Sequence, residues 1–104
     1  MNVHSESYIE NKVCKYAESL GVEQRKFVTP NRRSAPDRIF FAMGGCTLFI
    51  EFKRKGGKTT SGQDREISRL KALGFPVHVI DNIDDGKRVI TEWVTSIKAF
   101  ADAS

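Results

Sequence analysis

Glu51 and Lys53 are charged residues at the end of a largely apolar stretch that runs from Thr47 to Lys53. Such a stretch predicts a β-strand, in which side chains alternate between faces, so the two residues point the same way about 7 Å apart. An unpaired buried charge costs free energy, and strands that form a core usually avoid one. A carboxylate and an ammonium at this spacing could serve one reaction, in which the ammonium moves a proton or offsets negative charge.

A second carboxylate, Asp37, precedes another apolar run, Arg38 to Met43, and two glycines separate this run from the next strand. The pattern predicts a β-hairpin. The start of one hairpin strand lies beside the end of the other, so Asp37 is expected next to Glu51. With the carbonyl of Phe52 between Glu51 and Lys53, these oxygen atoms would suit Mg²⁺ or Mn²⁺. Such an ion can activate water and bind a phosphoryl oxygen.

The pattern of apolar residues predicts the elements that position these groups. It indicates a helix over 5–20 that Gly21 ends, a short extended segment at 27–28, and the hairpin. A helix capped by Ser61 should follow, with a buried stripe, then a strand over 77–80, a loop over 81–86 and a last helix. The stripe residues are Ile67, Leu70 and Leu73 in the first of these two helices, and Ile90, Trp93, Val94, Ile97 and Phe100 in the last.

The resulting order, α-β-β-β-α-β-α, predicts an α/β fold with a mixed central sheet flanked by helices. The third and fourth strands should be parallel, because a helix connects them. A length of 104 residues fits one domain spanning 1–104. No apolar run approaches the roughly 20 residues that span a bilayer, and the polar start does not resemble a signal peptide. A cytoplasmic protein is therefore expected.

The charge of the chain favours a polyanionic partner. Its net charge is +4, from 17 basic and 13 acidic residues. Basic residues gather between positions 26 and 58, a distribution typical of phosphate binding. The candidate phosphate contacts are Lys26, Arg32, Arg33, Arg38, Lys55 and Lys58. The two cysteines lack the spacing of zinc ligands and are expected to be reduced packing residues.

Several segments together resemble the VRR-NUC family of the PD-(D/E)xK nuclease superfamily. They are Lys26–Pro30, Arg32–Arg38 with its Pro36-Asp37 pair, Phe49–Lys53, Gly57–Gln63 and Leu73–Phe75. The resemblance covers roughly residues 5 to 83. The family usually has Gly where Ala35 stands and often Leu where Thr60 stands, and neither departure affects a candidate catalytic position.

The resemblance implies a restriction-endonuclease-like fold, dependence on Mg²⁺ or Mn²⁺, and hydrolysis of DNA phosphodiester bonds. Stand-alone members are similar to Holliday-junction resolvases and tend to form homodimers, so branched DNA is the implied substrate. The family also has a metal-binding glutamate on the first helix. Glu10 fits this position best and Glu6 is the alternative. Gln63 matches a family glutamine and lies on the apolar face of its helix, from which it could reach the site.

These observations predict a nuclease with a defined set of functional residues. The catalytic candidates are Asp37, Glu51, Lys53 and Gln63, and the metal-binding candidates are Glu10, Asp37, Glu51 and the carbonyl of Phe52. The alternatives are a non-catalytic DNA-binding module on the same fold, a nuclease that acts on flap or RNA substrates, and a basic interaction protein that binds a host factor.

Overall fold

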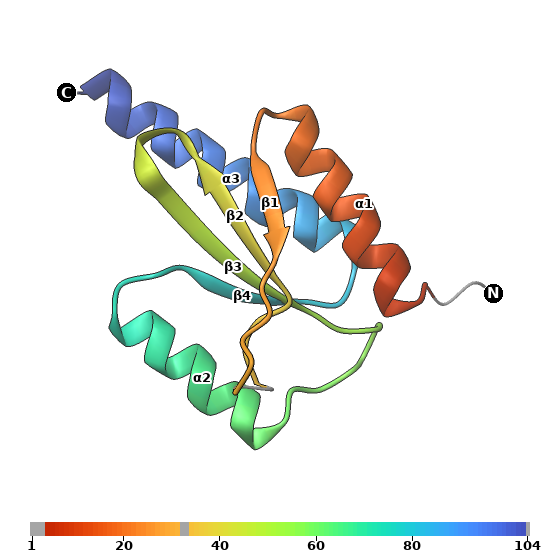
Figure 1. Ribbon diagram of the computed structural model, residues 1–104. Coiled ribbons are helices and arrows are strands. Elements are labelled where there is room, and N and C mark those ends of the chain that lie inside the picture. Colours follow the sequence, from red (N-terminus) through yellow and green to blue (C-terminus); the bar gives the residue numbers. More distant parts are fainter. Residues whose placement is uncertain (1–3, 32–33, 104) are drawn as a thin grey trace.

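A computed structural model describes residues 4–31 and 34–103, and within these ranges the chain forms a four-stranded sheet with three α-helices. The fold agrees with the predicted α/β class and with the predicted order of elements (Figure 1). The elements are α1 (Glu6–Ser19), β1 (Glu23–Lys26), β2 (Arg38–Ala42), the 3₁₀ turn η1 (Met43–Gly45), β3 (Cys46–Phe52), α2 (Ser61–Ala72), β4 (Val77–Ile80) and α3 (Ile83–Ala103).

The sheet has the strand order β1-β2-β3-β4. β2 and β3 form the predicted hairpin, with Arg38 opposite Ile50, and β1 extends it in the antiparallel sense. β4 pairs with β3 in parallel, as the intervening helix predicts. The turn between β2 and β3 uses Gly44 and Gly45 at positive φ, a conformation that costs glycine little.

Helices cover both faces of this sheet (Figure 1). α1 and α3 pack together on one face, where they bury Phe40, Leu48 and Ile50 in the larger core. α2 packs on the other face, where Phe49 and Ile67 belong to a smaller cluster. Side chains of β3 alternate between these two cores, so Glu51 lies on the α2 side.

Two predicted boundaries between α1 and α2 were wrong. The first strand is Glu23–Lys26 and not the apolar pair at 27–28. Most of its side chains are exposed, and the strand is fixed by backbone pairing with β2, which a side-chain pattern does not report. The N-cap of α2 is Thr60 and not Ser61, because the Thr60 side chain accepts the hydrogen bond from the backbone of Gln63.

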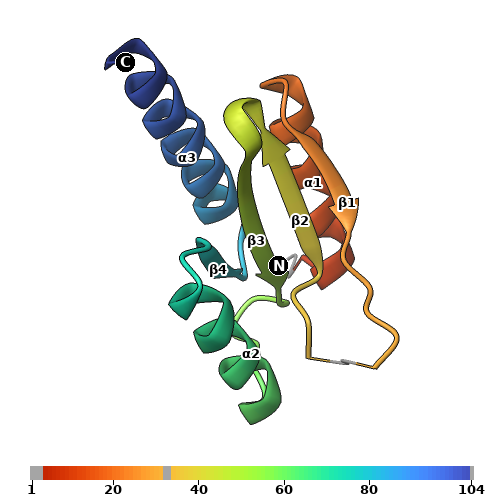
Figure 2. The ribbon, with the colours of Figure 1, turned by 60° about the vertical axis from the view of Figure 1, so that its left-hand side comes forward.

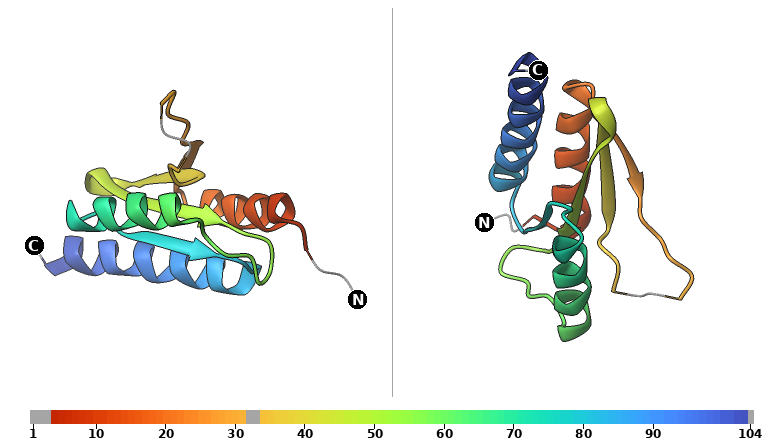
Figure 3. Two further views of the ribbon diagram at one scale, coloured as in Figure 1. Left: turned by 90° about the horizontal axis from the view of Figure 1, so that it is seen from below. Right: turned by 90° about the vertical axis from the view of Figure 1, so that its left-hand side faces the viewer.

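In the second half, the expected loop over 81–86 is shorter, because α3 begins at Ile83. Asn82 accepts a hydrogen bond from the backbone N–H of Asp85, and acidic residues in the first turn suit the positive end of a helix. Two residues expected on buried faces are exposed, Leu73 at 71% and Phe100 at 78%. Leu73 is the C-cap of α2, and Phe100 lies in the end of α3 that extends beyond the β2–β3 turn (Figures 1 and 3).

Among residues 4–31 and 34–103, no helix combines the length and the apolar character needed to cross a bilayer.

Candidate active site

The candidate site lies at one end of the sheet, where β2 begins and β3 ends (Figure 2). Asp37 immediately precedes β2. Glu51 is the residue before the last one of β3, and Lys53 directly follows that strand. The antiparallel register brings these positions together, as the sequence predicts.

Asp37, Glu51 and Lys53 form one contiguous group of charges. Lys53 Nζ lies 3.4 Å from Glu51 Oε2, and the backbone N–H of Phe52 donates to Asp37 Oδ2 at 2.7 Å. Glu51 is only 3% exposed. Burial, followed by the nearby charge of Asp37, raises the pKa of Glu51 to about 7, although Lys53 opposes the shift. The partly buried Asp37 therefore opposes the ionisation of the buried Glu51, which is an arrangement that a bound cation would relieve.

Gln63 joins this group from α2, which packs on the same face of the sheet as Glu51. Its amide nitrogen donates to Glu51 Oε2 at 3.1 Å, while its amide oxygen accepts from the backbone N–H of Thr60 at 2.9 Å. Thr60 and Gln63 form a capping box at the start of α2. The capping box at the N-terminus of α2 therefore also fixes the Gln63 side chain, which holds Glu51.

The two glutamates considered on α1 have different surroundings. Glu10 is bound by Arg38, whose Nε donates to its carboxylate at 2.5 Å. Glu6 lies one turn earlier and, together with Lys53, lines an open cavity of about 420 Å³. Partial burial, followed by the charge of Asp37, raises the pKa of Glu6, and Lys53 acts in the opposite direction. Of the two, Glu6 is the one whose charge faces the cavity and the Asp37 group.

The donor chemistry of the site fits a hard divalent ion better than zinc. Within the described ranges, no three His, Cys, Asp or Glu side chains are clustered closely enough to form a complete metal site. The available ligands are the neighbouring carboxylates of Asp37 and Glu51, with Glu6 near enough for the charge of Asp37 to act on it, and they offer oxygen only. Both cysteines are free, as predicted, and burial raises the pKa of the Cys14 thiol to about 11.

The predicted phosphate contacts are dispersed around the site. Lys58 lines the cavity that contains Lys53. Lys26 is exposed on β1. The guanidinium of Arg38 is engaged by Glu10 and by the side chain of Gln24. Arg32 and Arg33 lie outside the described residues. Arg54, which was not among the candidates, lines the same cavity as Lys58.

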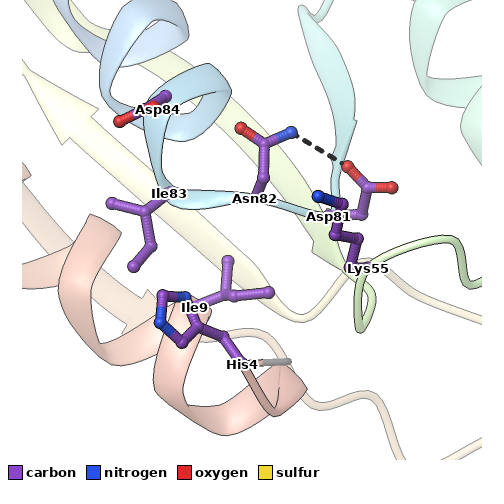
Figure 4. Close-up of a pocket in the computed structure, with 7 residues that line it drawn as sticks. All are labelled: His4, Ile9, Lys55, Asp81, Asn82, Ile83 and Asp84. Carbon is purple, nitrogen blue, oxygen red and sulfur yellow. Dashed lines mark hydrogen bonds between the residues drawn. The ribbon is translucent and has the colours of Figure 1, made fainter. Parts of the chain in front are cut away.

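Lys55 points to a second cavity, of about 300 Å³, on the side of α3 (Figure 4). There Asp81 accepts hydrogen bonds from the backbone N–H of Gly56 at 3.0 Å and from Asn82 at 3.0 Å. These bonds hold the pKa of Asp81 below its usual value. They attach the basic loop that follows Lys53 to the end of β4.

Sequence patterns alone missed two of these features. The Arg38 contacts join residues far apart in the chain, and no local pattern marks them. The link between Asp81 and Gly56 is equally non-local. The Thr60–Gln63 capping box was also missed, because the prediction placed the cap at Ser61, although the spacing of Thr60 and Gln63 in the sequence fits a capping box.

Comparison with known proteins identifies the family. No protein-family model matches the chain. The "Putative nuclease p44" of Acyrthosiphon pisum secondary endosymbiont phage 1 is 39% identical over 84 residues, which are 81% of this chain and 90% of that protein. A solved "VRR_NUC domain" superposes with a TM-score of 0.77 at 26% identity, over 83% of this chain and 94% of the other. A "VRR_NUC domain protein" shares the fold, with a TM-score of 0.70 at 19% identity over 90% and 91% of the two chains. The chain therefore belongs to the VRR-NUC family.

Proposed function

We propose that the protein is a metal-dependent endonuclease that hydrolyses phosphodiester bonds of DNA. The observation that carries this proposal is the group formed by Asp37, Glu51 and Lys53. Asp37 opposes the ionisation of the buried Glu51, and the ammonium of Lys53 lies 3.4 Å from the Glu51 carboxylate. Fold stability alone disfavours such an arrangement, because burying like charges costs free energy. Membership of a nuclease family supports the same reading.

Each residue of the group has a task in this reaction. Asp37, Glu51 and the carbonyl of Phe52 would hold Mg²⁺ or Mn²⁺, and Glu6 takes the place on α1 for which Glu10 was the first choice. The bound ion would supply Lewis-acid chemistry to the phosphate and to a water molecule. Lys53 orients that water or offsets the charge that develops on the phosphate. Gln63 holds the Glu51 carboxylate in place through its 3.1 Å hydrogen bond.

Basic side chains beside the cavity would hold the DNA backbone. Lys53, Arg54 and Lys58 line it together, and contacts of this kind position a nucleic acid without reading its sequence. Lys26, Arg32, Arg33 and Lys55 remain candidates for more distant phosphates. We further propose that the substrate is branched, with the four-way junction as the first candidate, and that a two-fold homodimer presents two sites to it.

A cleavage assay tests the proposal. Purified protein is incubated with Mg²⁺ or Mn²⁺ and with linear, flap, four-way and single-stranded DNA and with RNA. Cleavage should require the ion and should fall by about 100-fold or more in Lys53→Ala, the loss typical of removing a group that stabilises a transition state. Lys98→Ala, on the exposed end of α3, is the matched control and should cleave normally.

Three results would contradict this proposal in different ways. Binding to DNA without cleavage would indicate a non-catalytic module. Preference for RNA would change the substrate class. Cleavage that Lys53→Ala leaves intact would remove the proposed site from the reaction.

A further inference from the structure

Arg38 lies on the opposite face of the sheet from Glu51, beneath α1. It pairs across the ladder with Ile50, which belongs to the core between the sheet and α1. Its Nε donates to Glu10 Oε2 at 2.5 Å, and its Nη1 donates to Gln24 Oε1 at 2.6 Å. The side chains of Arg38 and Glu10 are 18% and 15% exposed. The pair is thus largely shielded from water, where an ion pair is more consequential than on a surface.

The position of this pair relates it to the candidate site. Arg38 directly follows Asp37 in the chain. Glu10 lies four residues after Glu6 on α1, so the two glutamates share one side of that helix. The ion pair therefore connects the backbone that carries Asp37 with the helix that carries Glu6.

We propose that the ion pair between Arg38 and Glu10 is a positioning device that fixes α1, and with it the Glu6 carboxylate, against Asp37 and Lys53. The proposal rests on the function proposed above. Carboxylates that share a metal must be held to within about 0.5 Å, whereas one residue of a helix advances it by about 1.5 Å. A small displacement of α1 along its axis would therefore separate Glu6 from its partners. In this arrangement Glu10 is not itself a metal ligand, and Arg38 is not itself a phosphate contact.

A different role for Arg38 makes different predictions. If Arg38 bound a DNA phosphate, replacing it would raise KM and weaken the dependence of binding on salt. Replacing Glu10 would then leave KM unchanged or lower it, because an acid near the phosphate would be lost. A positioning role predicts instead that both replacements have the same effect.

The test compares Arg38→Met, Glu10→Met and the double variant with the wild type. The readouts are the dissociation constant of Mn²⁺, measured calorimetrically without DNA, and kcat and KM for the preferred DNA. Each single variant should weaken Mn²⁺ binding and lower kcat by about 10- to 100-fold, as is typical for residues that orient metal ligands. KM should not change. The double variant should be no worse than either single one, because both act through one contact.

Arg88→Met and Glu92→Met are the matched controls. These residues form an exposed ion pair on α3, with 3.3 Å between Arg88 Nη1 and Glu92 Oε2. They lie far along the sequence from the residues of the candidate site. Their replacement should leave Mn²⁺ affinity and kcat unchanged. If a single variant at Arg38 or Glu10 fails to fold because it leaves one charge buried, the double variant decides, since two neutral side chains usually replace a buried pair without such a loss.

The outcomes separate this inference from the proposed function. A folded double variant with wild-type Mn²⁺ affinity and kcat would overturn the inference and leave the nuclease intact. A raised KM in Arg38→Met but not in Glu10→Met would assign Arg38 to the DNA instead. If the wild type does not cleave DNA, the proposed function fails, whereas the Mn²⁺ titration still decides whether the pair positions Glu6.

Discussion

Replacing Glu51 by Gln should stabilise the metal-free protein at alkaline pH while it abolishes activity. Its pKa lies at about 7 instead of the ordinary 4.5, because burial and Asp37 disfavour the charged carboxylate. Between these two values the folded state holds a proton that the unfolded state has lost. The contribution of Glu51 to stability is therefore fully present below pH 4.5 and is lost as the pH rises from 4.5 through 7. Above pH 7 the charged carboxylate costs the folded state about 3 kcal/mol.

Gln cannot be charged, so Glu51→Gln removes this cost but also removes the ionic partner of Lys53. We expect a net gain in the free energy of unfolding of about 1 to 3 kcal/mol at pH 8. For a chain of this size, that gain would raise Tm by about 4 to 8 °C per kcal/mol. Thermal melts in EDTA at pH 4 and pH 8 measure it, and the difference between variant and wild type should vanish at pH 4.

Glu66→Gln is the matched control for this experiment. Glu66 is also buried, at 9% exposure, but its carboxylate lies 3.1 Å from Arg69. Its replacement should not stabilise the protein at pH 8. Adding Mn²⁺ should then raise the Tm of the wild type and not that of Glu51→Gln, since a cation that binds only the folded state stabilises it. A Glu51→Gln variant no more stable than the wild type in EDTA at pH 8 would refute the reasoning.

Three further changes test other contacts of the fold. Gln63→Glu should keep the capping box but place a third carboxylate against Glu51, so kcat should fall by about 10- to 100-fold with the helix cap intact. Gln63→Ala should also lower the free energy of unfolding, measured by chemical denaturation, by about 1 kcal/mol. Gly86→Ala should destabilise the protein by about 1 to 3 kcal/mol, because the added Cβ would overlap Val13 where α3 meets α1; a melt unchanged from the wild type would show that the helices can separate freely. Asp81→Ala should release Gly56 and raise KM for DNA through a looser basic loop, whereas Asp81→Asn keeps an acceptor and should resemble the wild type in steady-state assays.

Local patterns in the sequence predicted the hairpin and the α/β order because these depend on near neighbours. Alternation along β3 placed Glu51 and Lys53 on one side, and a glycine turn returned the chain so that Asp37 met them. The parallel pairing of β4 followed from the helix before it. Burial was less predictable where an element ends. Leu73 and Phe100 continue the apolar periodicity of α2 and α3, but at the ends of these helices their side chains stay exposed.

The tertiary structure alone decided which acid of α1 faces the site. Glu6 and Glu10 lie one turn apart on the same helix, and periodicity treats them alike. Their surroundings differ because Arg38, which is 28 residues from Glu10 in the chain, binds Glu10. Glu6 instead lies near the charges of Asp37 and Lys53. The sequence by itself determined that carboxylates and a lysine converge at the end of a hairpin. The packing of α1 on the sheet decided which of its two glutamates lies near them, since contacts between distant segments exist only in the folded chain.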